Sequence, residues 1–434
     1  MKFKLLAGAA CAALMGLAAP LAASPPTSAP IAARSSGAAA QAVADFYAYR
    51  KGAPLWLRQD AGQPAARELI GTLRRAALDG MPSGPALAAQ AETLLARASA
   101  GDASALNAAD RLLSTAWVLY VQALQQTPAG MTIADGWAAP RAQPATEILQ
   151  RAAAAPSLAS HVRSVSMVNP IYAELREAAW RQMAATGSPD PRALANLDRA
   201  RAMPFQDRYI MVDAGSARLW MVENDRIVDS MKVIVGKPTT QTPMLASTIY
   251  RATLNPYWNV PGDMVKSLIA PRVVDQGIGY LKSHGYEVLS DYSGNAAVLD
   301  PAKVDWRAVA AGRETVKVRQ LPGPANSMGE MKFGFPNKHD IFLHDTPKKE
   351  LFASNDRDVS NGCIRLEDAE RLGRWLLGRD PVALSSRPEQ QVLLPTPVPV
   401  YVTYLTTEAG NGRLSFLEDA YGRDAQRGAI IAAR

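Results

Sequence analysis

A change in sequence pattern at residues 208–236 decides the fold of the second half of the chain. These residues read RYIMVDAGSARLWMVENDRIVDSMKVIVG. Short runs rich in β-branched and aromatic side chains alternate here with turn residues, which is typical of strands joined by tight turns. The pattern predicts three strands, at 208–212, 218–222 and 231–235, with a turn at Asn224-Asp225. Similar runs recur later, so residues 203–424 are expected to form a mainly β domain; the further runs lie at 248–254, 331–335, 341–344 and 398–404.

The first half of the chain has a different pattern. From residue 41 to residue 200 it is rich in Ala and Leu, and apolar positions recur with helical spacing, as at Leu69, Leu73 and Ala76. Such spacing places the apolar side chains on one face of a helix. We therefore expect an α+β multidomain chain, with an all-α domain over 41–200 ahead of the mainly β domain. A length of 434 residues with 48% hydrophobic residues agrees with two domains.

The N-terminus has the features of a secretion signal. Lys2 and Lys4 precede an apolar stretch that ends in small residues at Leu21-Ala22-Ala23. This order predicts a signal peptide over 1–23 and export to the periplasm, followed by a flexible linker over 24–40 that is rich in Ala, Pro and Ser. The alternative is an uncleaved membrane tether, since about 18 apolar residues can just span a bilayer. Against it, about half of the run is Ala and Gly, which insert weakly.

Charge and motifs exclude several classes of function. The formal net charge is +7, and loss of Lys2 and Lys4 with the signal would leave +5 (7 − 2 = 5). The basic residues are scattered, without a Lys/Arg block, so nucleic acid is not expected as a partner. The chain has no glycine-rich phosphate loop, no zinc-ligand spacing and no serine nucleophile elbow. Neither a cofactor nor a metal is therefore expected.

The chain contains two cysteines, and only one of them would remain after export. Cys11 leaves with the signal peptide, so Cys363 is expected to be a lone thiol in a compartment where thiols normally pair as disulfides. A strand at 341–343 should deliver His344 at its end, where Asp345-Thr346-Pro347 turns the chain. An exported lone thiol with a histidine nearby in sequence favours a reactive cysteine over an inert buried one.

The residues around the cysteine extend this prediction. Residues 360–365 read SNGCIR, and a helix is predicted from Glu367 onward. Cys363 would then lie just ahead of a helix N-terminus, where the backbone dipole favours a thiolate, and the imidazole of His344 would complete an ion pair. Gly362 permits a tight turn, so that the amides of Gly362 and Cys363 would point at a developing oxyanion. Together these features predict a Cys/His acyl-transfer site.

The same residues resemble a known signature. His344-Asp345-Thr346-Pro347 followed by SNGCIR is similar to the catalytic domain of L,D-transpeptidases of the YkuD type, a His and then [Ser/Thr]-x-Gly-Cys. The subgroup that the chain resembles is that of the larger YcbB-like enzymes, in which a helical scaffold precedes the catalytic domain. Further segments support the resemblance; they are VGK at 235–237, QTP at 241–243, NPYWNVP at 255–261, FPN at 335–337 and DAYGRD at 419–424.

The resemblance implies a ping-pong acyl transfer on peptidoglycan stem peptides. Cys363 would be the nucleophile and His344 the base, and an amine of a second stem would resolve the thioester as a 3→3 crosslink. By position, Gly362 and Cys363 would supply the oxyanion amides, while Ser360, Asn361 and Arg365 would shape the donor site. Three alternatives stay open: water as the acceptor would make a peptidoglycan hydrolase, a lysine of an envelope protein would make an anchoring enzyme, and an unreactive cysteine would leave a non-catalytic wall-binding scaffold.

Two departures from the family pattern and one insertion complete the prediction. Asn361 stands where many relatives have His. The peptidoglycan-binding module of larger relatives is expected to be absent, since only about 45 residues lie between Gln126 and Tyr172. Residues 263–324 interrupt the β pattern and return beside the strands that lead to His344. An excursion of this kind is expected to be a lid; the alternative is a small surface subdomain without contact to substrate.

Overall fold

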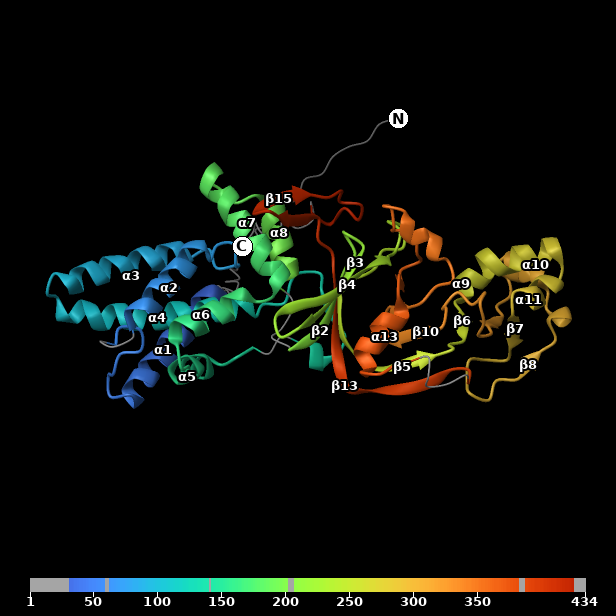
Figure 1. Cartoon of the computed structure of the whole chain (residues 1–434), viewed down its shortest axis with the longest axis horizontal. Helices are drawn as coiled ribbons and strands as arrows, with labels where there is room; N and C mark the ends of the chain where they lie inside the picture. Colours follow the sequence, from blue (N-terminus) through green and yellow to red (C-terminus); the bar gives the residue numbers. More distant parts are fainter. Residues whose placement is uncertain (1–30, 59–61, 140–141, 202–206, 382–386, 425–434) are drawn as a thin grey trace, which may run out of the picture.

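The computed structural model describes residues 31–58, 62–139, 142–201, 207–381 and 387–424. A helical part, a β-rich part and a separate lobe follow one another along the longest axis of the molecule (Figure 1). The predicted α+β class, with an all-α first half and a mainly β second half, is confirmed. The predicted signal peptide at 1–23 lies outside the described residues. No helix within the described ranges is both long and apolar enough to cross a membrane.

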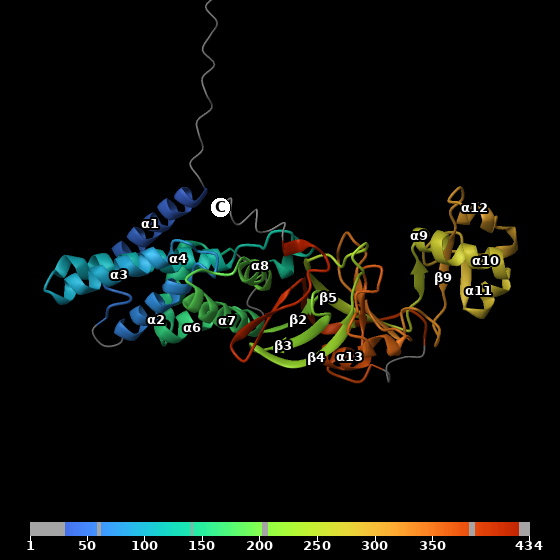
Figure 2. The ribbon, with the colours of Figure 1, turned by 90° about the horizontal axis from the view of Figure 1, so that it is seen from above.

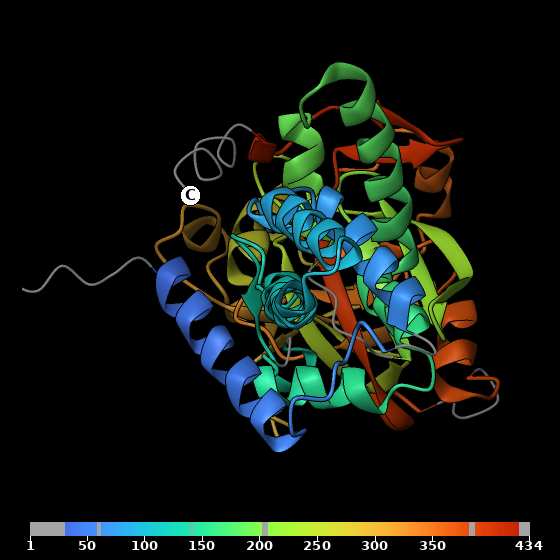
Figure 3. The same ribbon diagram turned by 90° about the vertical axis from the view of Figure 1, so that its left-hand side faces the viewer.

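The N-terminal part is helical because its Ala/Leu-rich stretches each bury one apolar face. Figure 3 shows α4 (Ala103–Leu124) end-on, while α1 (Ile31–Tyr49) lies across the view. At the start of α4 the Asp102 side chain accepts a hydrogen bond from the Ser104 amide at 3.0 Å and so caps the helix. The helices are α1 (Ile31–Tyr49), α2 (Gly62–Arg75), α3 (Gly84–Ser99), α4 (Ala103–Leu124), α5 (Ala145–Ala154), α6 (Leu158–Met167), α7 (Pro170–Thr186) and α8 (Pro191–Ala200).

Helix α1 corrects one prediction. It begins at Ile31, inside the segment 24–40 that was expected to be a flexible linker. The Ala residues that suggested a linker are also the strongest helix formers, and the helix continues into an apolar stretch that packs on the domain through Val43 and Tyr47. Residues 24–30 lie outside the described part of the chain.

The predicted meander at 208–236 is present. It forms β2 (Arg208–Asp213), β3 (Arg218–Glu223) and β4 (Arg226–Ile234), so the third strand begins five residues earlier than predicted (231 − 226 = 5). At the turn between β3 and β4, Asn224 and Asp225 both have positive φ, at 49° and 60°. Two residues in this conformation are typical of a hairpin turn whose twist matches that of the strands.

These strands belong to a nine-stranded sheet that closes on itself. Its order is β1-β5-β10-β11-β12-β4-β3-β2-β13, and β13 also pairs with β5. The helical part contributes β1, which runs parallel to β5 with Thr132 opposite Leu245. Helix α13 (Ala369–Leu377) follows β12, and the hairpin of β14 (Thr407–Gly410) and β15 (Arg413–Phe416) follows β13. The other strands are β1 (Thr132–Ile133), β5 (Leu245–Leu254), β10 (Met331–Gly334), β11 (Phe342–His344), β12 (Ile364–Leu366) and β13 (Gln390–Thr403).

The insertion at 263–324 folds as a lobe of its own. Figure 2 shows it standing apart from the large sheet at one end of the molecule. Its four-stranded sheet has the order β6-β9-β7-β8 and, with its helices, encloses a separate apolar core that includes Val260, Ile269 and Val318. The elements are β6 (Trp258–Val260), α9 (Gly262–Met264), α10 (Ala270–Gln276), α11 (Gly279–Ser283), β7 (Tyr286–Leu289), β8 (Val298–Leu299), α12 (Trp306–Ala310) and β9 (Lys317–Gln320).

Candidate active site

Two adjacent parallel strands, β11 and β12, position the predicted histidine and the loop that ends in the predicted cysteine. In the pairing of β11 with β12, Leu343 lies opposite Ile364 and His344 lies opposite Arg365. Successive side chains of a strand point to opposite faces. Leu343 and Ile364 are fully buried in the core, so His344 and Arg365 point to the other face. Cys363 immediately precedes β12, two residues before Arg365, and the charge of Arg365 acts on both His344 and Cys363.

The geometry around His344 fixes its tautomer. The ring is buried, and its Nδ1 lies 2.5 Å from the carbonyl oxygen of Asp345. A carbonyl oxygen can only accept a hydrogen bond, so Nδ1 carries the proton and Nε2 is left as the acceptor nitrogen. Burial, followed by the nearby charge of Arg365, lowers the pKa of His344 to about 3. The imidazole is therefore neutral at pH 7 and can take up a proton only through Nε2.

The thiol of Cys363 is also neutral in the resting protein. Its Sγ lies 3.6 Å from the carbonyl oxygen of Asp340. Burial raises the pKa of the Cys363 thiol to about 11, although a hydrogen bond from the Phe342 backbone and the charge of Arg365 both favour the thiolate. Cys363 is a free cysteine. The predicted ion pair between thiolate and imidazolium is therefore not the resting state.

The prediction that Cys363 lies at a helix N-terminus is wrong. The residues after it form β12, and α13 begins only at Ala369, with Asp368 as its cap. Ile364 and Leu366 are taken into the sheet because they pair with β11 on one side and β4 on the other. No helix dipole acts directly on the thiol, since that effect falls off within one turn.

Ser360 braces the loop that carries the cysteine. Its hydroxyl accepts a hydrogen bond from the Gly362 amide at 3.0 Å and donates one to the Cys363 carbonyl at 2.7 Å. Gly362 has φ of 116°, a conformation that favours glycine. Because the Gly362 amide is already bonded to Ser360, it does not point freely at a reacting oxygen as predicted. Of the two amides proposed as oxyanion donors, that of Cys363 remains the candidate.

Arg365 and Asn361 differ in their surroundings. Arg365 is partly buried, and its guanidinium has no hydrogen bond or ion pair with any residue that the structure describes. Its charge acts on both His344 and Cys363. The Lys332 side chain adds a second positive charge, since Lys332 lies opposite His344 on β10, although its ammonium also lies 3.7 Å from the Glu389 carboxylate. Asn361 is exposed and its amide nitrogen lies 3.7 Å from the sulfur of Met264, at the base of the insertion lobe.

Two residues that support this loop were not assigned a role from the sequence. The Thr242 hydroxyl donates a hydrogen bond to the Gly362 carbonyl at 2.8 Å, and the Tyr421 hydroxyl contacts the segment that carries Thr242. Both belong to segments that were quoted only for their family resemblance. Within the described ranges, no three His, Cys, Asp or Glu side chains are placed to hold a metal ion.

Comparisons with known proteins match both halves of the chain. Residues 207–384 match the family model of the YkuD L,D-transpeptidase catalytic domain, and residues 41–178 match that of a Scaffold domain. A Haemophilus influenzae protein named "Putative L,D-transpeptidase" is 31% identical over 238 residues, which are 53% of this chain and 47% of the relative. The chain thus spans about half the length of that relative. No peptidoglycan-binding module is among these matches.

Solved structures of transpeptidases show weaker similarity. An L,D-transpeptidase from Mycobacterium smegmatis aligns at 12% identity with a TM-score of 0.24, covering 46% of this chain and 60% of that chain. L,D-transpeptidase 3 from Mycobacterium tuberculosis aligns at 11% identity with a TM-score of 0.23, covering 46% of this chain and 63% of that chain.

Proposed function

We infer that this chain, in which an L,D-transpeptidase catalytic domain of the YkuD family follows a helical Scaffold domain, is an enzyme that crosslinks peptidoglycan stem peptides. The observation that supports this most directly is that β11 ends at His344 beside the start of β12, which Cys363 immediately precedes. The imidazole there is locked with Nε2 as its acceptor. We propose that the enzyme works in the periplasm, because the sequence predicts an N-terminal secretion signal.

The neutral pair supports general-base catalysis. As Sγ attacks the carbonyl of the L-centre of diaminopimelate, its proton passes to Nε2 of His344 and the carbonyl oxygen gains negative charge. The Cys363 amide is the proposed donor to that oxygen. When the tetrahedral intermediate collapses, the C–N bond to D-alanine breaks and the imidazolium returns its proton to the leaving amine. A thioester remains on Cys363.

The second half of the reaction reverses these roles. An amine of another stem peptide attacks the thioester carbonyl and loses a proton to His344. The C–S bond then breaks and the departing sulfur recovers that proton, so the enzyme returns to its neutral state. The product is a 3→3 crosslink. Neither half-reaction requires a cofactor or a metal.

Arg365 supports an acidic peptide as the substrate. Stem peptides carry free carboxylates, and a partly buried guanidinium that has no hydrogen bond or ion pair with the described residues is suited to bind one in a bidentate manner. Lys332 adds to the positive potential. We propose that this pair of charges draws the donor stem to Cys363. The charge of Arg365 also favours the thiolate that forms when the C–S bond breaks.

Mass spectrometry of muropeptides tests the proposal. The purified protein is incubated with tetrapeptide-bearing muropeptides, beside Cys363→Ala as the inactive variant, with folding of both checked by thermal unfolding. We expect dimers from the wild type and none from Cys363→Ala, because the thiol is the proposed nucleophile. Turnover by Cys363→Ala would refute the mechanism.

The same experiment separates the alternatives. Tripeptides without dimers would indicate a hydrolase, and transfer only to an added lysine-bearing protein would indicate an anchoring enzyme. An unmodified intact mass after exposure to excess carbapenem, together with no turnover, would indicate a non-catalytic wall-binding scaffold. A strained lactam carbonyl is an electrophile that a reactive Cys363 should attack.

A further inference from the structure

Two segments far apart in the sequence form layers behind the cysteine loop (residues 360–363). The first is the turn segment (residues 236–242), which follows β4. Ser360 donates its amide to the Val235 carbonyl at 2.8 Å and accepts from the Lys237 amide at 3.0 Å. Thr242 completes the contact, since its hydroxyl accepts from the Gly236 amide at 2.9 Å and donates to the Gly362 carbonyl at 2.8 Å. The cysteine loop therefore takes its position from the turn segment.

The turn segment is packed too closely to adjust by itself. A side chain at Gly236 would place its Cβ 2.1 Å from the Thr240 carbonyl oxygen and 2.7 Å from the Thr242 amide. Thr242 is fully buried. Buried amides and carbonyls need partners, and a lost partner costs free energy or moves the backbone. The position of Thr242 thus depends on what lies behind it.

Behind it lies the C-terminal strap (residues 417–424). The Tyr421 hydroxyl donates a hydrogen bond to the Gly236 carbonyl and accepts one from the Thr242 amide at 3.4 Å. The guanidinium of Arg423 holds the Thr242 carbonyl at 3.0 Å and the Gln241 side chain at 2.9 Å. These contacts reach both ends of the turn segment. The strap lies outside residues 207–384, which the catalytic-domain family model covers.

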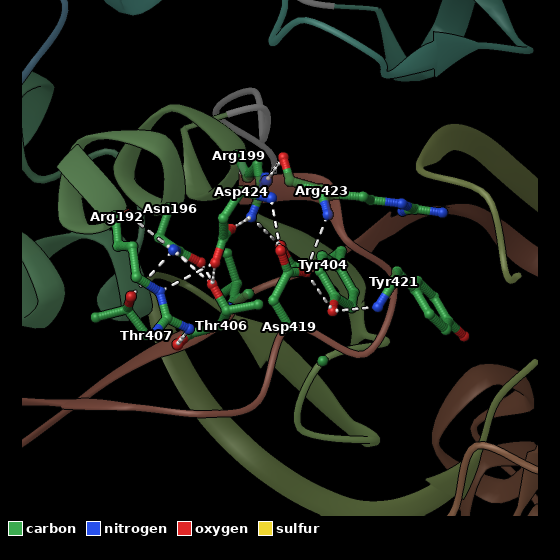
Figure 4. A network of polar contacts seen from close by, with 12 residues as sticks. Arg192, Asn196, Arg199, Tyr404, Thr406, Thr407, Asp419, Tyr421, Arg423 and Asp424 are labelled. Atoms are coloured by element: carbon green, nitrogen blue, oxygen red, sulfur yellow. Dashed lines mark hydrogen bonds and ion pairs between the residues drawn. The ribbon is translucent and has the colours of Figure 1, made fainter. Parts of the chain in front are cut away.

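The strap is in turn fixed to the helical part. Figure 4 shows Arg192 and Arg199 of α8 pointing at Asp424, with N–O distances of 3.0 and 2.7 Å. Tyr404, directly after β13, donates its hydroxyl to Asp419 at 2.9 Å and stacks on Tyr421 with ring centroids 4.7 Å apart. A continuous set of contacts therefore runs from α8 through the strap to the cysteine loop.

We propose that Tyr421 and Thr242 are positioning residues for Cys363. Through their hydrogen bonds, the C-terminal strap, which is fixed to α8, holds the cysteine loop in place. This inference rests on the proposed function. Neither side chain touches the reacting atoms: Tyr421 acts through Thr242, and Thr242 acts through the Gly362 carbonyl. A displacement of about 1 Å at a reacting group can cost about a hundredfold in rate, so small shifts of this loop matter.

Four variants test the proposal. Tyr421→Phe removes one hydroxyl, Thr242→Val removes the hydroxyl that holds Gly362, and Thr242→Ser restores it. Tyr250→Phe is the matched control, because the Tyr250 hydroxyl is hydrogen-bonded to Asp135 at 2.5 Å, away from the cysteine loop. Three properties are measured for each variant: kcat and KM of crosslinking, the midpoint of thermal unfolding, and the rate of Cys363 alkylation by iodoacetamide as a function of pH.

We expect Tyr421→Phe and Thr242→Val to lower kcat about tenfold or more with KM within about twofold, and to change the alkylation profile. Thr242→Ser and Tyr250→Phe should match the wild type in all three. Effects of Tyr421→Phe no larger than those of Tyr250→Phe, or a failure of Thr242→Ser to rescue, would overturn the proposal. If the wild type forms no crosslinks, the proposed function fails, but the alkylation profiles still decide whether the strap positions the thiol.

Discussion

Alkylation of Cys363 by iodoacetamide should become faster with pH well beyond neutrality, without a plateau. Iodoacetamide reacts with the thiolate, so its rate follows the thiolate fraction. A pKa of about 11 for Cys363, against 9.0 for an ordinary cysteine, leaves about one thiol in 10,000 ionised at pH 7 instead of about one in 100. Cys363 should therefore react about a hundredfold more slowly than a small peptide thiol at pH 7.

The assay is intact-mass spectrometry at intervals between about pH 6 and about pH 10, with the peptide thiol as reference. The logarithm of the rate should rise with unit slope through this range. Arg365→Gln should slow the reaction further, because the charge of Arg365 lowers the pKa of the thiol. A rate that is already level between about pH 5 and about pH 8 would show a thiolate–imidazolium pair at rest and would refute the neutral-pair mechanism.

Four further changes have expected outcomes of their own. His344 has a folded pKa of about 3 against 6.5, so its contribution to stability is present above pH 6.5 and is lost as the pH falls. Between pH 7 and pH 4.5, denaturant unfolding should show about 2.5 kcal/mol more loss of stability in the wild type than in His344→Gln. His339→Ala should leave the rate of carbapenem acylation within about twofold of the wild-type rate, because His339 is exposed. His344→Ala should abolish acylation, and equal losses in the two variants would contradict the assignment of His344 as the base. Asp110→Ala should destabilise the helical part by about 3 kcal/mol in denaturant unfolding, because the Asp110 carboxylate accepts backbone amides of Leu55, Trp56 and Leu57 at 2.7 to 2.9 Å. Replacing residues 263–324 by a short Gly/Ser linker should preserve small-molecule acylation of Cys363, since the lobe has its own core. The same deletion should abolish transfer between stems, since the lobe contacts Asn361. Unchanged crosslinking by a folded deletion variant would show that the lobe is not a lid.

Local patterns in the sequence were sufficient to predict the main elements. The meander at 208–236 has alternating apolar residues and a turn at Asn224-Asp225, and these signals act within a few residues of one another. The helical first half is specified in the same way by its apolar spacing. The residues of the candidate site were also proposed from sequence, because a cysteine after Gly362 and a histidine at a strand end are visible without a structure.

Contacts between distant segments decided the properties of those residues. Residues 364–366 were expected to lead directly into a helix, yet their pairing with β4 and β11 makes them a strand. The same pairing buries Cys363 and His344 beside Arg365, which reverses the predicted ionisation of the thiol. Tyr421 reaches the turn segment across 179 residues to Thr242.

The sequence by itself therefore determined which residues are the candidates for the reaction, because the chemistry of a thiol and an imidazole belongs to the side chains. Only the tertiary structure decided their protonation, the orientation of the Gly362 amide, and the support of the cysteine loop. These properties depend on burial and on charges and hydrogen bonds brought in from remote segments, and no local pattern around Cys363 records which segments those are.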